Sequence, residues 1–209
     1  MSLTKQLLAC TALLAGVSAS AAPIVTVGAG TAVQTVLRST SFDGIGGDLT
    51  NYVSNGLRVA VPGSNCCFSG VHYEAGGNTA YVTITTPESL NFSALEVEVG
   101  SGYSDTMLNV VWQTLLDGNV TGSGMVPMFG SNGLANGFSV FGIRDLGLFD
   151  TLRIGAAPSA YAYTSFGQFQ AIALDNLRIG SAAAVPEPAT LGLLGLALAC
   201  MGFVRRKRG

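Results

Sequence analysis

The chain has 209 residues, of which only 11% are charged. Residues 22–185 contain five arginines, no lysine and eleven acidic side chains, a net charge of −6, because half of the basic residues lie in the terminal segments. Nucleic-acid binding depends on basic side chains that neutralise phosphates, so this balance excludes a nucleic-acid partner. These 164 residues are enough for one domain with a hydrophobic core, whereas two domains would be crowded.

Residues 1–21 have the three parts of a secretory signal peptide. Lys5 forms a short basic region, residues 7–17 are largely apolar, and Ala19 and Ala21 provide an Ala-x-Ala cleavage site before Ala22. A lipoprotein signal at Cys10 is disfavoured, because most of the apolar stretch follows this cysteine. We therefore expect an N-terminal signal helix, cleavage by signal peptidase and a mature domain outside the cytoplasm.

Residues 22–181 are predicted to form an all-β domain. Short runs rich in β-branched and aromatic residues are separated by Gly, Asn and Asp turns: YVTITT (81–86), ALEVEVG (94–100), MLNVVWQTLLDG (107–118) and FQAIALDNLRIG (169–180). No apolar stripe with helical spacing competes with them. The pattern is typical of an antiparallel β-sandwich or a barrel.

The segment ALEVEV shows the alternation of a half-buried strand. Leu95, Val97 and Val99 fall on one face, and Glu96 and Glu98 fall on the other. We expect the first set in the core and the glutamates on an outward charged face.

The segment LLDGNV predicts a β-hairpin. Asp117 and Gly118 form a favoured two-residue turn between two apolar runs. Trp112 lies in the strand before this turn, and we expect it in the core rather than at a binding surface.

Candidate catalytic residues are few. His72 is the only histidine, and a catalytic triad would need a serine and an acid from elsewhere in the chain, so a surface imidazole is favoured. Glu96 and Glu98 are the best carboxylate pair, because two residues along a strand span about 6.6 Å, near the separations that glycosidases use. A hydrolase that uses Glu96 or Glu98 is the alternative function, although LEVEVG lacks the Glu-x-Asp-x-x-Glu pattern of jelly-roll glycoside hydrolases.

The loop FDGIGGD is a candidate calcium site. Calcium prefers oxygen ligands from carboxylates and carbonyls, which Asp43, Asp48 and this loop could supply. The competing interpretation is that Asp43 and Gly44 form a simple turn.

Cys66 and Cys67 are adjacent in the loop PGSNCCFSG. Their Cα atoms would be about 3.8 Å apart, below the usual disulfide range of roughly 4.4–6.8 Å. A strained vicinal disulfide, two free thiols and bridges to another molecule all stay open. A zinc site is disfavoured, because His72 alone cannot complete tetrahedral ligation.

Exposed tyrosines are candidates for stacking against sugar rings. Tyr161 and Tyr163 share one face of YAYTSF, and Tyr103 lies in a Gly-rich turn. The competing interpretation is that these side chains pack the ends of the sandwich.

Residues 182–209 predict a transmembrane helix with a basic end. The uncharged run 191–204 has 14 positions, whereas a span takes roughly 20 and at least about 17. The apolar run becomes longer if it includes Ala189, Thr190 and the uncharged stem 182–185. The positive-inside tendency would keep the following cluster in the cytoplasm: Arg205, Arg206, Lys207 and Arg208.

This C-terminal order resembles a known sorting signal. Val185, Pro186, Glu187 and Pro188, followed by a Gly/Leu/Ala helix and an Arg-rich end, resemble the PEP-CTERM signal of Gram-negative bacteria, also catalogued as the ice-binding protein C-terminal domain. The resemblance implies processing near Pro186–Pro188 by an exosortase, a membrane protease-transpeptidase of bacteria that make exopolysaccharide. A plain membrane helix without processing is the alternative.

The central segments resemble a second family. SFDGIGGDLTNYVSNGLRV (41–59), GYSDTMLNVVWQTLLDGNVTGS (102–123) and AIALDNLRI (171–179) are similar to jelly-roll domains that are common in PEP-CTERM proteins and resemble carbohydrate-binding modules. This resemblance implies a jelly-roll sandwich with a structural calcium between the first loops and the last strand, and it nominates Asp175 as a third ligand. The competing interpretation is that Asp175 caps local backbone.

Together these features predict an exported PEP-CTERM protein, anchored in the inner membrane before processing and then delivered to the cell surface or an exopolysaccharide matrix. The expected role is structural or glycan-binding and non-catalytic. The expected partners are signal peptidase, exosortase and an extracellular polysaccharide, and structural Ca²⁺ is the one cofactor considered.

Overall fold

The computed structural model describes residues 23–28, 30–44, 50–61, 73–75, 81–102, 105–131, 138–158 and 169–182. Secondary structure in these ranges consists of β-strands. The strands are β1 (Ile24–Val27), β2 (Thr35–Thr40), β3 (Asn51–Ser54), β4 (Leu57–Ala60), β5 (Tyr73–Ala75), β6 (Val82–Thr85), β7 (Phe92–Ser101), β8 (Thr106–Leu116), β9 (Asn119–Gly130), β10 (Ser139–Phe149), β11 (Thr151–Pro158) and β12 (Ile172–Ser181).

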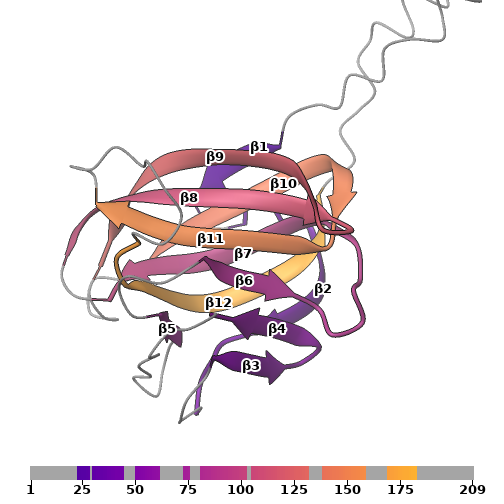
Figure 1. The fold of residues 1–209 in the computed structure, drawn as a ribbon, viewed down its shortest axis with the longest axis horizontal. Helices are drawn as coiled ribbons and strands as arrows, with labels where there is room; N and C mark the ends of the chain where they lie inside the picture. The colour runs from indigo at the N-terminus through magenta and orange to yellow at the C-terminus, as the bar shows by residue number, and fades with distance from the viewer. Residues whose placement is uncertain are drawn as a thin grey trace, which may run out of the picture.

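The described strands form two antiparallel sheets that pack face to face (Figure 1). Sheet A has the order β1-β10-β7-β12-β2, with β5 also paired to β12, and sheet B has the order β3-β4-β6-β11-β8-β9. The four segments predicted as strands from sequence appear as β6, β7, β8 and β12. The predicted antiparallel β-sandwich is confirmed.

The core lies between the two sheets. Leu95, Val97 and Val99 of β7 belong to one cluster of buried side chains with Leu108 and Trp112 of β8. The predicted core face of β7 and the predicted burial of Trp112 are therefore confirmed.

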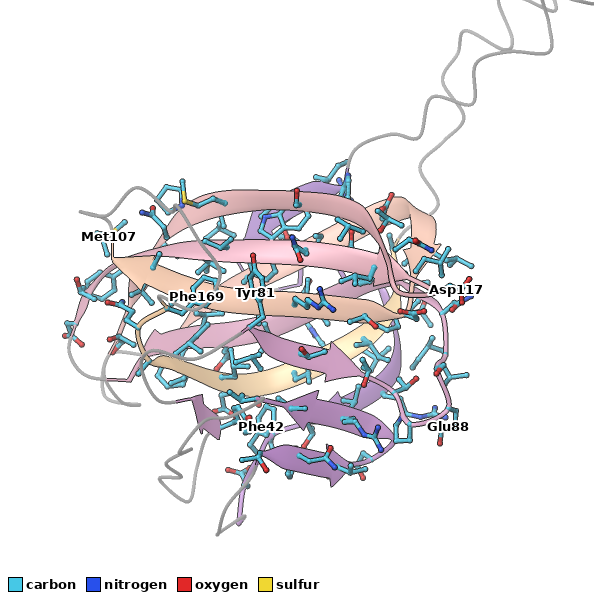
Figure 2. The ribbon with its side chains drawn as sticks, viewed as in Figure 1. Phe42, Tyr81, Glu88, Met107, Asp117 and Phe169 are labelled. Atoms are coloured by element: carbon cyan, nitrogen blue, oxygen red, sulfur yellow. The ribbon has the colours of Figure 1, made fainter. Side chains whose placement is uncertain are left out.

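A second apolar cluster covers part of the outer face of sheet B. Val111 points away from the core, because its neighbours in β8 point into it, and it clusters with Tyr81, Ala157 and Phe169. The Tyr81 and Phe169 rings pack with centroids 4.8 Å apart (Figure 2). This outer face of sheet B is largely apolar around these residues.

The predicted hairpin joins β8 and β9. Asp117 and Gly118 have φ angles of 51° and 78°, and positive φ at both central residues is the geometry of a type I′ turn. The two strands then pair from Leu116–Asn119 to Thr106–Gly130.

The connection between β1 and β2 crosses the outer face of sheet A. β1 and β2 are near neighbours in sequence but lie at opposite ends of the strand order, so the chain between them has to pass over the sheet. We name its described part, Gly30–Gln34, the strap. The Val33 N–H donates to the side chain of Glu96, which lies on the face of β7 opposite the core. The strap is therefore on the outer face.

Two glycines let the chain around the strap approach the sheet closely. A Cβ added at Gly142 of β10 would lie 3.0 Å from the Cβ of Ala32, and one added at Gly180 of β12 would overlap the carbonyl oxygen of Thr35. A larger residue at Gly180 would displace backbone, whereas one at Gly142 would displace the side chains of Thr26 and Ala32.

Within the described ranges, no helix is long and apolar enough to cross a membrane. The predicted signal helix (1–21) and the predicted transmembrane helix within residues 182–209 fall almost wholly on positions outside those ranges.

Gly180→Ala is expected to lower the free energy of unfolding by about 3 kcal/mol, at the upper end of overpacking penalties. The reason is that the added methyl group would meet the Thr35 carbonyl, which is backbone and cannot rotate away. Chemical denaturation of the purified protein measures this change.

Gly147→Ala is the matched control, because an added Cβ there would lie at an ordinary 3.7 Å from Oδ1 of Asp145. Its expected effect is within about 0.5 kcal/mol. Equal losses in the two variants would contradict the close approach at Gly180.

Candidate functional site

Glu96 lies on the outer face of sheet A, as the alternation predicts, but it is not on an exposed charged face. Its relative exposure is 1%, because the strap covers it. Glu98, two residues further along β7, is only partly buried. The prediction of an outward charged face is therefore wrong for Glu96, since a segment distant in sequence lies over it.

The Glu96 carboxylate accepts five hydrogen bonds from described residues. Three come from the strap: the Gly30 N–H to Oε2 at 3.2 Å, the Ala32 N–H to Oε1 at 2.5 Å and the Val33 N–H to Oε1 at 2.9 Å. The other two come from Arg178 of β12, whose Nε lies 2.8 Å from Oε2 and whose Nη2 also contacts Oε2. The carboxylate thus joins the strap to β7 and β12.

These donors keep Glu96 ionised. Burial by itself raises the pKa of the carboxyl group, but the N–H groups of Val33 and Ala32 and the guanidinium of Arg178 outweigh it, so the net shift lowers the pKa from 4.5. Glu96 and Arg178 therefore form an ion pair at neutral pH, beneath the strap.

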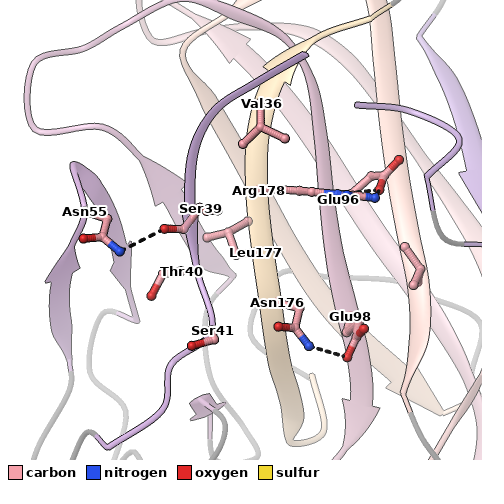
Figure 3. A pocket seen from close by; sticks show the side chains of 11 residues that line it. Val36, Ser39, Thr40, Ser41, Asn55, Glu96, Glu98, Asn176, Leu177 and Arg178 are labelled. Carbon is pink, nitrogen blue, oxygen red and sulfur yellow. Dashed lines mark hydrogen bonds and ion pairs between the residues drawn. The ribbon is translucent and has the colours of Figure 1, made fainter. Parts of the chain in front are cut away.

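A groove of about 600 Å³ lies on the same face, beside this ion pair (Figure 3). It crosses β10, β7, β12 and β2 and reaches the β3–β4 turn. Its lining residues are Val36, Ser39, Thr40, Ser41, Asn55, Glu96, Glu98, Val140, Asn176, Leu177 and Arg178.

Backbone irregularities aim two amides into the groove. Asn176 has a φ of 45° and lies where the pairing of β12 with β7 shifts register between Asp175 and Arg178. Its Nδ2 donates to Oε2 of Glu98 at 3.0 Å (Figure 3). Asn55, in the β3–β4 turn, has a φ of 49° and donates from Nδ2 to the Ser39 carbonyl at 3.1 Å. Both recorded contacts use the Nδ2 atom of the amide, and no contact of either amide oxygen with a described residue is recorded.

The geometry does not suit the alternative hydrolase. A glycosidase pair needs one carboxyl group with a raised pKa to act as the acid, whereas the pKa of Glu96 is lowered and its oxygens already accept five hydrogen bonds. Glu96 is positioned as a structural anchor, and Glu98 remains without a second free carboxylate in the described groove.

The predicted calcium ligands are only partly described. Asp43 is exposed after β2, and Asp175 is buried in β12. Oδ1 of Asp175 accepts the N–H of Asn176 at 2.8 Å, which matches the interpretation that it caps local backbone. Asp48 lies outside the described residues, and the described part holds no cluster of three metal-ligating side chains. The calcium site stays a prediction.

Several other predicted positions lie outside the described ranges. They are His72, Cys66, Cys67, Tyr103, Tyr161, Tyr163, the sorting residues Val185, Pro186, Glu187 and Pro188, and the basic cluster Arg205, Arg206, Lys207 and Arg208. The cysteine chemistry and the stacking role of the tyrosines therefore stay predictions.

Sequence reasoning missed most groove residues. Ser39, Asn55 and Asn176 are polar residues in or beside strands and carry no motif. The position of Arg178 could have been noticed, because it is a charged residue between the apolar residues Leu177 and Ile179. If such a strand lies in the middle of a sheet, its arginine is expected to pair with an acidic side chain. A search for an acid in a similar apolar run would have reached Glu96.

Comparisons with known proteins assign one segment of the chain to a family model. They also find solved structures that are similar to most of the chain. Residues 184–208 match the family model described as the PEP-CTERM protein-sorting motif, which confirms the motif predicted at the C-terminal end. A comparison with curated proteins finds no match.

Among solved structures, the chain is similar to a CBM22-1 xylan-binding domain from Paenibacillus barcinonensis, with 14% identity, a TM-score of 0.40, and coverage of 74% of this chain and 100% of that one. It is also similar to a family 11 carbohydrate-binding module from Clostridium thermocellum, solved with a β-1,3-1,4-mixed-linked tetrasaccharide. That match has 12% identity, a TM-score of 0.33, and coverage of 71% and 98%.

Glu96→Gln is expected to lower the free energy of unfolding by about 2–4 kcal/mol, because it removes charge-assisted hydrogen bonds from a buried site and leaves Arg178 unpaired. The glutamine amide would also direct an N–H toward donors of the strap. Glu98→Gln is the control on the same face of the same strand, with an expected loss below about 1 kcal/mol. Denaturant titration compares the two.

The effect of Glu96→Gln also depends on pH. A carboxyl group whose pKa is lowered on folding stabilises the protein fully above its unfolded pKa, near 4.5, and this contribution is lost as the pH falls through the folded value. The difference in stability between wild type and Glu96→Gln should therefore shrink below about pH 4.5. A difference of constant size, or equal losses in the Glu96 and Glu98 variants, would contradict the ionised anchor.

Proposed function

We propose that this protein, which carries a PEP-CTERM sorting motif, is exported, processed by an exosortase and delivered to the cell surface or an exopolysaccharide matrix, where its sandwich binds a polysaccharide without cleaving it. The observation that carries the binding role is the open polar groove on the outer face of sheet A.

The chemistry of the groove matches that of a sugar chain. Hydroxyl groups both donate and accept hydrogen bonds, and the groove offers an acceptor carboxylate in Glu98, amides in Asn55 and Asn176, and hydroxyls in Ser39 and Ser41. Val36 and Val140 add apolar surface for the C–H faces of sugar rings. Because the groove is partly open to solvent on the face of a sheet, we expect it to accept an internal stretch of a polymer as well as a chain end.

The position of the chain ends is compatible with binding during anchoring. In sheet A, Ile24 of β1 is paired with Arg144, Arg144 is paired with Ala94, and Ala94 is paired with Gly180 of β12. The start of β1 and the end of β12 therefore lie at the same end of the sheet. The groove extends from Val36, which is paired with Gly180 at this end, along the face to Glu98 and Val140. The part of the groove near Glu98 therefore lies farther along the sheet from the attachment through residues 184–208 than the part near Val36.

The sorting proposal predicts loss of the C-terminal segment near Pro186 only in cells that contain the exosortase. The measurement is the intact mass of the protein recovered separately from membrane and medium, with and without the exosortase. A chain with Pro186→Ala and Pro188→Ala should keep its C-terminal segment in both strains. A wild-type chain that stays full-length in the membrane of exosortase-containing cells would overturn the proposal.

The binding proposal predicts that Asn176→Gly weakens polysaccharide binding about three- to tenfold, as expected for one or two lost hydrogen bonds. Glycine accepts the positive φ of this position, so the change removes the amide without straining the backbone. The measurement is affinity electrophoresis of the processed protein in gels that contain xylan, mixed-linkage β-glucan, dextran or the extracellular polysaccharide of the host cells.

Ser89→Gly is the matched control, because Ser89 also has a positive φ of 53° and does not line the groove. It should bind as wild type does. If no polymer retards the wild-type protein, or if both variants lose binding equally, the groove is not a glycan site.

A further inference from the structure

We propose that the groove selects uncharged polysaccharide chains over acidic ones and that Glu98 determines this selectivity. The proposal rests on the glycan-binding function and names the class of polymer that the same groove takes.

Among the described residues, three charged side chains line the groove: Glu96, Glu98 and Arg178. Arg178 contacts Glu96 through both Nε and Nη2, so the positive charge is neutralised by the buried carboxylate. The Arg178 side chain as a whole is about one-third exposed. Its charge, however, is compensated before any ligand arrives.

Glu98 has no such compensation in the described part of the chain. Its recorded partner is the neutral amide of Asn176. Asp175, opposite Glu98 in the register, is a buried acid that does not line the groove. Arg38 of β2 is exposed and directs Nη1 to the Leu37 carbonyl, and it too is absent from the lining. The described residues of the lining therefore have a net charge of −1, located at Glu98.

A carboxylate-bearing sugar would meet this charge at short range. Two like charges a few ångströms apart at a partly exposed site repel by an amount that corresponds to about a tenfold loss of affinity or more. The net charge of −6 on residues 22–185 adds a longer-range repulsion, which salt screens beyond about 8–10 Å. A neutral chain avoids both costs, and its hydroxyls can donate to Glu98.

The test compares one polymer in three forms. The polymer that the processed wild-type protein binds best is used unmodified, hydroxyethylated and carboxymethylated, at matched chain length and substitution. The hydroxyethylated form controls for the bulk of the substituent. The proteins are wild type, Glu98→Gln and Glu88→Gln. Glu88 is an exposed acid between β6 and β7 that does not line the groove, so both variants lose one negative charge but only one loses it from the lining.

Wild type is expected to bind the carboxymethylated form about tenfold more weakly than the hydroxyethylated form at low salt. Glu98→Gln should reduce this preference to about threefold or less, whereas Glu88→Gln should keep it. Raising the ionic strength should narrow the preference of both proteins, because salt screens the charge of the whole domain, and the preference of wild type should stay the larger of the two because of the short-range repulsion at Glu98.

Other outcomes would overturn the proposal in distinct ways. An equal response of the two variants would assign the selectivity to the charge of the whole domain. Preference for the carboxymethylated form by wild type, or an unchanged preference in Glu98→Gln, would exclude Glu98 as its cause while leaving glycan binding intact. Absence of binding to every form would instead be the failure of the proposed function.

Discussion

The arrangement of sheet A depends on the hydrogen bonds that the buried carboxylate of Glu96 accepts. It lies on β7, the central strand of the order β1-β10-β7-β12-β2, and it binds the strap that joins the two edge strands. A buried charge is costly unless it is paired and fully hydrogen-bonded. The three strap N–H groups and Arg178 meet that requirement, so one side chain connects the centre of the sheet to both of its edges.

This anchor also determines the chemistry of the groove beside it. Glu96 and Glu98 are the same residue type on the same face of one strand, but the strap and Arg178 contact only Glu96. Arg178 is thereby neutralised within the protein, whereas the partner recorded for Glu98 among the described residues is the neutral amide of Asn176. Two glutamates that look equivalent in the sequence thus differ in the structure: Glu96 is a buried anchor, and Glu98 is a partly buried acceptor that lines the groove.

The success of the sequence predictions follows the range of the interactions involved. The strands β6, β7, β8 and β12 and the turn at Asp117–Gly118 were predictable because alternation and turn preferences act between near neighbours. The burial of Glu96 was not, since alternation separates two faces of a strand without indicating what covers either one. The groove was not predictable either, because its residues come from distant segments: Glu98 and Asn176 meet through the pairing of β7 with β12, and Asn55 comes from the other sheet and contacts Ser39 of β2.

By itself, the sequence determined the all-β class, the hairpin and the PEP-CTERM motif, because each is encoded in a continuous run of residues that acts locally or is recognised as a linear signal. Only the tertiary structure decided which charges neutralise each other and which polar groups share a groove. The pair of Glu96 and Arg178 spans 82 positions, and the strap contact with Glu96 spans more than 60. Contacts of such range form only when the strand order brings the residues together, and that order is a property of the whole sheet.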